Sequence, residues 1–249
     1  MPLWKRKAKN REEKSYKTEI KVENRVFDRS VLLSLDNLIK RRVIDSLDYC
    51  VSTGKEADVY RGTSHQGFVA VKIFRILTSG FNKFQEYFDE EMKIMTKKHS
   101  NLRELWAAKE FNNLEKIANL GIAPRPIHRI RNINVMEFLG EEGLPYPLLK
   151  NCKEYLDQNH YDAVIDAIKK MFENDLVHAD LSEFNILFTG ERIYVIDLAQ
   201  GVSTSHPESM KFLTRDIENI NKFFSEIEGI KTTDKEDIIK DLLKDKKNK

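Results

Sequence analysis

The sequence predicts an α+β fold of two unequal lobes, a β-rich lobe followed by a mostly helical one, with a cleft between them. Apolar residues alternate with a period of two from about residue 48 to residue 76, which is typical of antiparallel strands. Helical spacing dominates after about residue 148, interrupted by a polar hairpin from His178 to Asp197. Three units are expected: 1–45, a basic arm with a helix; 46–138, the first lobe; and 139–249, the second lobe with a basic tail.

The composition argues against a disulfide-rich, membrane-spanning or secreted protein. The 249 residues carry 42 Lys and Arg against 40 Asp and Glu, so the net charge of +2 predicts no general attraction to nucleic acid. Two cysteines exclude a disulfide framework and favour a reducing compartment. The longest strongly apolar run, Phe68–Val71, is far shorter than the ~18 residues of a membrane span, and the first residues lack the apolar stretch of a signal peptide. We therefore expect a cytoplasmic protein without a membrane partner.

The first unit combines a basic segment and a helix. Residues 1 to about 20 are rich in Lys and Arg and show no apolar periodicity. They form either a solvated arm or frayed helix, or a basic arm that contacts RNA phosphates, and the sequence leaves these interpretations open. The helix is expected from apolar residues at helical spacing: Val31, Leu32, Leu35, Leu38 and Ile39.

The first lobe is expected to contain an antiparallel meander. Its predicted strands are Tyr49–Val51, Ala57–Tyr60 and Phe68–Phe74. Residues 78–90 are expected to form a long mobile connection. A helix from Leu102 to Leu120 follows, ended by Gly121 and nearby prolines, and then a short strand, Val135–Leu139.

The second lobe is expected to be mainly helical around one hairpin. The predicted elements are helices near 148–157 and 161–174, a hairpin turned at Thr189-Gly190, a helix that reaches about 228, and an amphipathic stretch at 231–249.

Two charged residues stand in apolar surroundings. Strand alternation places Lys72 on one face with Phe68, Ala70 and Phe74, so its ammonium either reaches out to water or is held inside a cleft. Glu110 falls in the middle of the apolar arc of the 102–120 helix, where an unpaired carboxylate is costly. Lys72 is the candidate partner of Glu110, although these residues alone leave the pairing open.

The polar hairpin concentrates groups that suit a magnesium–nucleotide site. His178, Asp180 and Asn185 lie close together in sequence, and the apolar strand that follows ends on Asp197. Carboxylate and amide oxygens are ligands for Mg²⁺, and one carboxylate is left over as a base. The alternative is an ordinary turn, because Asp and Asn favour turns and His178 can be a packed core residue.

The pattern H-x-D-x-x-x-x-N, followed by Asp197 at a strand end, resembles the catalytic and metal loops of the protein-kinase superfold. V-A-V-K at 69–72 resembles the kinase lysine strand, Glu110 its helix partner, and 136–139 the hinge. The sequence departs from typical kinases in having one glycine in its nucleotide loop and Asp-Leu-Ala in place of Asp-Phe-Gly. No Ala-Pro-Glu follows, and too little chain remains for an activation segment or a peptide-binding subdomain.

With these departures, the sequence resembles one family, the RIO kinases, which are atypical serine kinases. The strings S-T-G-K-E-A-x-V-Y, H-A-D-L-S-E-F-N-I-L and I-D-L-A-Q are similar to its type-one branch, over about residues 48–225. The near absence of long tails resembles an archaeal member. The resemblance implies ATP and Mg²⁺, or Mn²⁺, as ligands.

The resemblance also implies the site residues. Lys72, oriented by Glu110, would hold the ATP phosphates, the Glu137 carbonyl and Leu139 amide would bind the adenine edge, and Asp180 would orient or deprotonate the accepting hydroxyl. Asn185 and Asp197 would bind the metal. The remaining implied ligands of ATP are Ser52, Thr53, Gly54, Lys55 and Val59 around the phosphate loop, and Ala70, Met136, Leu187 and Ile196 in the adenine slot, where core packing is the alternative role.

The implied function is phosphoryl transfer from ATP in maturation of the small ribosomal subunit. Asp197 would itself accept the γ-phosphoryl group, so that the protein acts mainly as an ATPase on a pre-small-subunit particle of rRNA and ribosomal proteins, with serine autophosphorylation besides. Two alternatives remain. One is an ATP-dependent scaffold that binds the pre-ribosome with little kinase activity, and the other is a small-molecule phosphotransferase of the aminoglycoside-kinase type.

Overall fold

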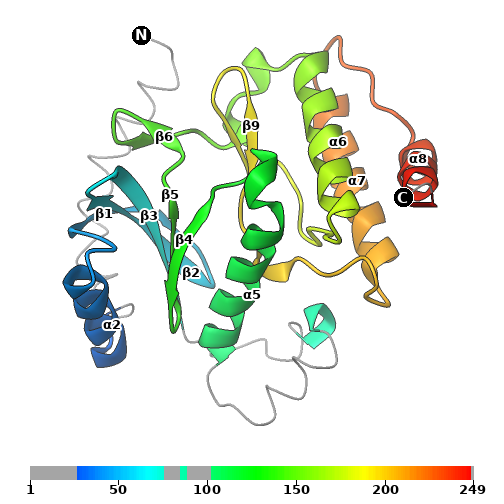
Figure 1. The fold of residues 1–249 in the computed structure, drawn as a ribbon. Helices are drawn as coiled ribbons and strands as arrows, with labels where there is room; N and C mark the ends of the chain where they lie inside the picture. Colours follow the sequence, from blue (N-terminus) through cyan, green and yellow to red (C-terminus); the bar gives the residue numbers. More distant parts are fainter. Residues whose placement is uncertain (1–26, 76–84, 89–101, 248–249) are drawn as a thin grey trace.

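The computed structural model describes residues 27–75, 85–88 and 102–247 (Figure 1). The predicted basic arm lies outside the described residues, as does the predicted connection at 78–90 except for residues 85–88, which contain the 3-10 turn η1 (Gln85–Tyr87). In the described part, a β-rich half precedes a mainly helical half, as the sequence predicts. No helix among the described residues is both long and apolar enough to cross a membrane.

An antiparallel sheet forms the first half, with the strand order β1-β2-β3-β5-β4. The strands are β1 (Ser46–Thr53), β2 (Ala57–Ser64), β3 (Gly67–Phe74), β4 (Pro126–Ile130) and β5 (Ile133–Glu137). In this register Lys72 of β3 lies between Val59 of β2 and Asn134 of β5. The edge strand β4 was missed in the sequence. Its two isoleucines, Ile127 and Ile130, are three residues apart, so the sequence of β4 lacks the apolar alternation that predicts a strand.

The two faces of the sheet pack against different helices. Val69, Val71 and Ile73 face helix α2 (Arg29–Lys40), whose N-terminus is capped by the Asp28 carboxylate. The residues between them, such as Ala70 and Phe74, join the core on the other face. The predicted helix is therefore confirmed, but two members of its apolar set point to solvent: Leu32 is 53% and Ile39 is 45% exposed.

Helix α5 (Leu102–Ile117) covers the second face of the sheet (Figure 1). Trp106, Ala107 and Leu114 are buried in the same core as Ala70. The helix tightens into the 3-10 turn η2 (Ala118–Leu120) and ends at Gly121, whose φ of 66° is left-handed. The predicted helix and its termination at this glycine are confirmed.

The second half is built from helices around the polar hairpin. Its regular elements are the hairpin β6 (Gly140–Glu141) and β7 (Leu144–Pro145), α6 (Gln158–Glu173), the hairpin β8 (Ile186–Phe188) and β9 (Ile193–Val195), the 3-10 turn η5 (Leu198–Gln200), α7 (Ser209–Ser225) and α8 (Lys235–Lys247). Residues of the sheet, α5, α6, α7 and the second hairpin share one hydrophobic core. The two halves are therefore packed directly against each other through this core.

The helix predicted near 148–157 is wrong. Two 3-10 turns, η3 (Leu149–Asn151) and η4 (Lys153–Tyr155), replace it. The Lys150 N–H donates to the carbonyl of Glu183, and Leu148 bridges to Leu187 of β8. Backbone groups that a helix would pair internally are thus bonded to the polar hairpin, which the sequence of this segment does not reveal.

Candidate active site

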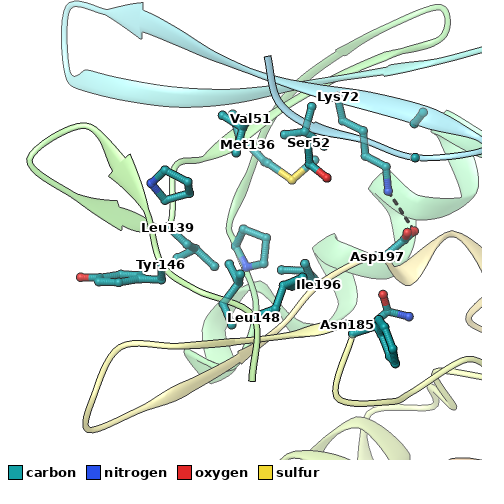
Figure 2. Close-up of a pocket in the computed structure, with 18 of the residues that line it drawn as sticks. Val51, Ser52, Lys72, Met136, Leu139, Tyr146, Leu148, Asn185, Ile196 and Asp197 are labelled. Carbon is teal, nitrogen blue, oxygen red and sulfur yellow. Dashed lines mark hydrogen bonds and ion pairs between the residues drawn. The ribbon is translucent and has the colours of Figure 1, made fainter. Parts of the chain in front are cut away.

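A cavity of about 1070 Å³ lies between the sheet and the helical half (Figure 2). Every site residue implied by the sequence lines it: Ser52, Thr53, Gly54, Lys55, Val59, Ala70, Lys72, Glu110, Met136, Glu137, Leu139, Asp180, Asn185, Leu187, Ile196 and Asp197. The volume is that of a site for a nucleotide-sized ligand. Figure 2 shows Lys72, Asn185 and Asp197 at one end of the cavity, and Leu139 and Tyr146 at the other.

The ammonium of Lys72 joins two carboxylates at the polar end. Its Nζ lies 2.6 Å from Oε1 of Glu110 and 2.9 Å from Oδ1 of Asp197. The Asn134 amide donates to the other oxygen of Glu110, 3.1 Å away, so both Glu110 oxygens are bonded. Lys72 is 7% and Glu110 2% exposed. The pairing that the sequence left open is therefore made, and Lys72 is a buried cation rather than one that reaches out to water.

Mutual attraction among these three charges opposes the effect of desolvation on their pKa values. Burial alone would lower the pKa of Lys72, but Asp197 and Glu110 raise it above its usual value. Burial would raise the pKa of Asp197, yet Lys72 holds it below the usual range for an aspartate. For Glu110 the balance is different, because burial raises its pKa and Lys72 only partly opposes that effect.

The loop before β8 presents Asp180 and Asn185 to the cavity. The buried carboxylate of Asp216 on α7 accepts the N–H groups of Ala179 (2.8 Å) and Leu181 (2.9 Å), on either side of Asp180. Ala179 has a left-handed φ of 64°, a conformation that costs energy in a residue other than glycine and that these bonds help to hold. Asp216 was not predicted as a site residue; its position on the buried face of α7 was the available signal in the sequence.

Asp180 itself stands in a carboxylate-rich environment. Burial and the nearby Asp197 raise the pKa of Asp180 above its usual value. Asn185 donates through its amide nitrogen to the Asp180 carbonyl, 2.8 Å away, which leaves the amide oxygen free to face a ligand. Glu56, also missed in the sequence, lines the same cavity, and burial together with Asp197 raises its pKa to about 7.

His178 does not line the cavity but forms hydrogen bonds to the backbone of the loop before β8. Its Nδ1 accepts the Asp180 N–H, so its Nε2 carries the proton and donates to the Ile196 carbonyl, 3.1 Å away. Burial lowers the pKa of His178 to about 4, which agrees with this neutral tautomer. The ring thus ties the loop before β8 to the chain just before Asp197, as the core-residue alternative for His178 predicts.

Asp197 is held in an unusual backbone conformation at the end of the second hairpin. Its φ of 64° and ψ of 63° are left-handed. The Asn113 amide on α5 donates to the carbonyls of Leu198 and Gly201, both 2.9 Å away, and so fixes the turn η5 that follows. The Ile196 N–H donates to the Asn185 carbonyl, which places the two implied metal ligands side by side.

Asn185 and Asp197 fit Mg²⁺ better than a transition metal. They offer one amide and one carboxylate oxygen, and Mg²⁺ keeps several waters and needs few protein ligands. Among the described residues no group of three or more His, Cys, Asp or Glu could hold a metal ion by itself. The residues at the polar end therefore suit a hydrated Mg²⁺ that a phosphate group completes.

The opposite end of the cavity is apolar and carries backbone hydrogen-bonding groups. Met136 and Ala70 form buried walls there. The Leu139 carbonyl accepts the Tyr146 N–H, and the Glu137 N–H donates to the Arg125 carbonyl. The Glu137 carbonyl and the Leu139 N–H, the two groups implied to bind adenine, are not used in these bonds.

Comparison with known proteins identifies the family. A model of the RIO domain matches residues 58–238 of this chain. The chain belongs to the RIO-domain family. Among RIO proteins, the serine/threonine-protein kinase Rio1 of Thermoplasma acidophilum is 39% identical over 76% of this chain and 100% of its own length. The kinase RIO3 of Caenorhabditis elegans is 36% identical over 88% of this chain, which spans only 45% of that relative. The predicted family is thus confirmed.

A solved RIO structure shares the fold. The Rio2 kinase of Chaetomium thermophilum, in a complex described as ADP/Mg²⁺-phosphoaspartate, superposes with a TM-score of 0.62 at 21% identity, over 90% of this chain and 74% of the other. This likeness confirms the predicted two-lobed kinase-like α+β fold.

Proposed function

We propose that this RIO domain binds ATP with Mg²⁺ and transfers the γ-phosphoryl group, as a serine kinase and ATPase. The observation that carries the proposal is the contact of Lys72 with both Glu110 and Asp197 in one cavity with Asp180 and Asn185. The relatives named as RIO-type serine/threonine-protein kinases support it. On this proposal the nucleotide lies between the lobes expected at 46–138 and 139–249.

The side chains divide the work of phosphoryl transfer. Lys72 binds phosphate oxygens, and Glu110 and Asn134 keep its ammonium in place. Asn185 and Asp197 would hold Mg²⁺, which would neutralise charge on the phosphates; Mn²⁺ would fit the same oxygen ligands. The loop from Ser52 to Lys55 covers the triphosphate with hydroxyl and amide donors in place of the missing glycines.

Two acceptors are available for the phosphoryl group. A serine hydroxyl can attack the γ-phosphorus while Asp180 takes its proton and the bond to the β-phosphate oxygen breaks, releasing ADP. Alternatively, a carboxylate oxygen of Asp197 attacks, ADP leaves, and water then cleaves the acyl phosphate to release phosphate and regenerate the carboxylate. The solved Rio2 complex with phosphoaspartate supports the second route.

The expected partner is a pre-small-subunit particle of rRNA and ribosomal proteins, in the cytoplasm. The support is the family resemblance and the basic residues at both ends of the chain, Lys5 to Lys17 and Lys244 to Lys249. An ATP-dependent scaffold is the competing function, and it differs by needing nucleotide binding without turnover. A small-molecule phosphotransferase is disfavoured, because the chain belongs to the RIO-domain family.

The deciding experiment is Asp180→Ala, measured by release of phosphate from ATP and by calorimetric ATP binding. We expect turnover to be abolished while the affinity for ATP stays within a few-fold of wild type, because Asp180 acts on the acceptor rather than on the nucleotide. Asp166→Ala, at an exposed ion pair on α6, is the matched control and should keep full turnover. Undiminished turnover in Asp180→Ala would contradict the proposal, and a wild type that binds but never turns over ATP would favour the scaffold.

The phosphoryl acceptor can be identified chemically. After incubation with labelled ATP, a phosphate on Asp197 should be released by hydroxylamine and be missing in Asp197→Asn, whereas phosphoserine is acid-stable and resists hydroxylamine. Label that entirely resists hydroxylamine would exclude Asp197 as the acceptor and leave the serine kinase route.

A further inference from the structure

The apolar end of the cavity is walled by a very small hairpin. The hairpin β6–β7 pairs only Gly140 with Pro145 and Glu141 with Leu144. Leu144, Pro145 and Tyr146 on its second arm line the cavity. Two residue pairs are too few to hold a hairpin in place, so its position depends on what it is attached to.

Two side chains of the sheet hold the tip of this hairpin at a single atom. Arg61 of β2 donates through Nη1 to the Gly143 carbonyl at 2.9 Å, and the Tyr49 hydroxyl of β1 donates to the same oxygen at 2.8 Å. Arg61 is itself oriented by its Nε, which donates to Asp48 at 2.9 Å. Gly143 has a left-handed φ of 78°, which favours glycine, and a Cβ there would lie 2.6 Å from Nη1 of Arg61 and displace it.

Aromatic rings complete the attachment. The Arg61 guanidinium lies 4.5 Å from the centroid of the Tyr49 ring and 4.7 Å from that of Phe68 on β3. Phe68 in turn contacts Phe138, which precedes the hairpin, with centroids 6.0 Å apart. These contacts explain why an aromatic residue that is 46% exposed stands on β3. The four residues Tyr49, Arg61, Phe68 and Gly143 are called the hairpin clasp below.

We propose that Arg61 is a positioning residue for the nucleotide base, acting through the hairpin clasp. Arg61, unlike Tyr49 of the clasp, is not among the residues that line the cavity, whereas the second arm of the hairpin it holds is. Figure 2 shows Leu139 and Tyr146, which flank the hairpin on either side, at the end of the cavity away from Lys72 and Asp197. The clasp therefore fixes the wall against which the base packs and leaves the phosphate-binding end unchanged. This inference rests on the proposed ATP binding and goes beyond it by assigning a residue to base affinity.

The test compares a ligand that has phosphates with one that lacks them. In Arg61→Met the dissociation constants of Mg²⁺–ATP and of adenosine should both rise by about tenfold, while kcat at saturating ATP stays at the wild-type value. Tyr49→Phe removes one of the two bonds to Gly143 and should raise both constants by a smaller, equal factor. Arg129→Met, on the exposed face of β4, is the matched control and should change neither constant.

The possible results distinguish a failure of the inference about Arg61 from a failure of the proposed ATP binding. An unchanged affinity for adenosine in Arg61→Met overturns the inference, as does a fall in kcat without a rise in KM. If Arg61→Met fails to fold, Tyr49→Phe decides in the same way, because it keeps the ring and removes a single hydroxyl. A wild-type chain that binds neither ATP nor adenosine would contradict the proposed function itself.

Discussion

Lys72 shows how much one residue depends on its partners. Its ammonium is nearly buried, and an isolated ion there would cost several kcal/mol. The carboxylates of Glu110 and Asp197, 2.6 Å and 2.9 Å from the Lys72 Nζ, compensate for this cost. Alternation in the sequence places Lys72 on an apolar face, but Glu110 is 38 residues away in the chain. The choice between a solvated and a buried lysine therefore required the tertiary structure.

Replacement of Lys72 should separate its catalytic effect from its effect on stability. We expect Lys72→Met to lower ATP turnover by roughly 10²-fold or more, because transition-state charge on the phosphates loses a preorganised cation. It should also lower the free energy of unfolding, because Glu110 is left buried without its cation. Adding Glu110→Gln should restore part of that stability and none of the turnover, as measured by urea denaturation and phosphate release. Equal stability of the single and double variants would contradict this account.

His178 should make stability depend on pH. Its pKa is about 4 in the folded chain against about 6.5 when unfolded, so only the unfolded chain binds the proton between these values. Its contribution is fully present above pH 6.5 and is lost as the pH falls toward 4, to a total of about 3 kcal/mol.

The measurement is urea denaturation of wild type and His178→Gln at pH 7.5 and pH 5. The difference between the two proteins should shrink or reverse at pH 5, and comparing them removes the opposite contributions of Glu56 and Asp216, whose raised pKa values favour the folded state at low pH. A difference that is the same at both pH values would mean that His178 titrates normally.

Among the elements, α5 organises both sides of the polar end. Glu110 on this helix holds Lys72 of β3, and Asn113, one turn later, holds the carbonyls of η5 just after Asp197. The Asn134 amide of β5 donates to the Ala107 carbonyl and so fixes the helix against the sheet. One helix therefore sets the distance between the lysine and the aspartate.

Substitutions on α5 should reveal this role. We expect Asn113→Ala to remove two hydrogen bonds, one to each of these carbonyls, which keep Lys109 Nζ and the Gly201 N–H as donors. It should lower the free energy of unfolding by about 1–3 kcal/mol and reduce turnover more than ATP affinity. Asn112→Ala, at the exposed neighbouring position, is the control and should match wild type in both measurements. If the two variants behave alike, the bonds from α5 to η5 do not position Asp197.

Elements whose own sequence carries apolar periodicity or a turn motif were predicted. Elements that depend on hydrogen bonds to distant parts of the chain were not. The predicted α5 and the second hairpin are confirmed because apolar periodicity and a Thr-Gly turn mark them. The edge strand β4 was missed. The segment 148–157 was predicted as one helix, but its backbone forms two short 3-10 turns and also bonds to Glu183 and β8.

At the scale of the whole molecule, the cavity lies between halves that share a hydrophobic core. Ala70 and Met136 of the sheet belong to the same buried cluster as Ile168 of α6 and Phe212 of α7. A ligand that contacts both halves therefore stabilises the folded chain as a unit.

Nucleotide should raise the stability of the whole chain. At a concentration of Mg²⁺–ADP about 100 times its dissociation constant, the free energy of unfolding should rise by about 2.7 kcal/mol by mass action. Removal of Mg²⁺ with a chelator should cancel most of this gain, and Asp197→Asn should reduce it, whereas Asp166→Ala should not. Equal stabilisation by ADP with and without Mg²⁺ would contradict the assignment of Asn185 and Asp197 as metal ligands.

By itself the sequence determined the family, the α+β class and sixteen of the residues that line the cavity, because those depend on local periodicity and on short motifs read in order. It did not determine that Lys72 touches both carboxylates, that Asp216 and His178 hold the loop around Asp180, or that Arg61 reaches Gly143. These contacts join residues far apart in the chain, or hold a left-handed backbone in place. Only the packing of sheet, α5 and second hairpin against one another brings such groups within hydrogen-bonding distance.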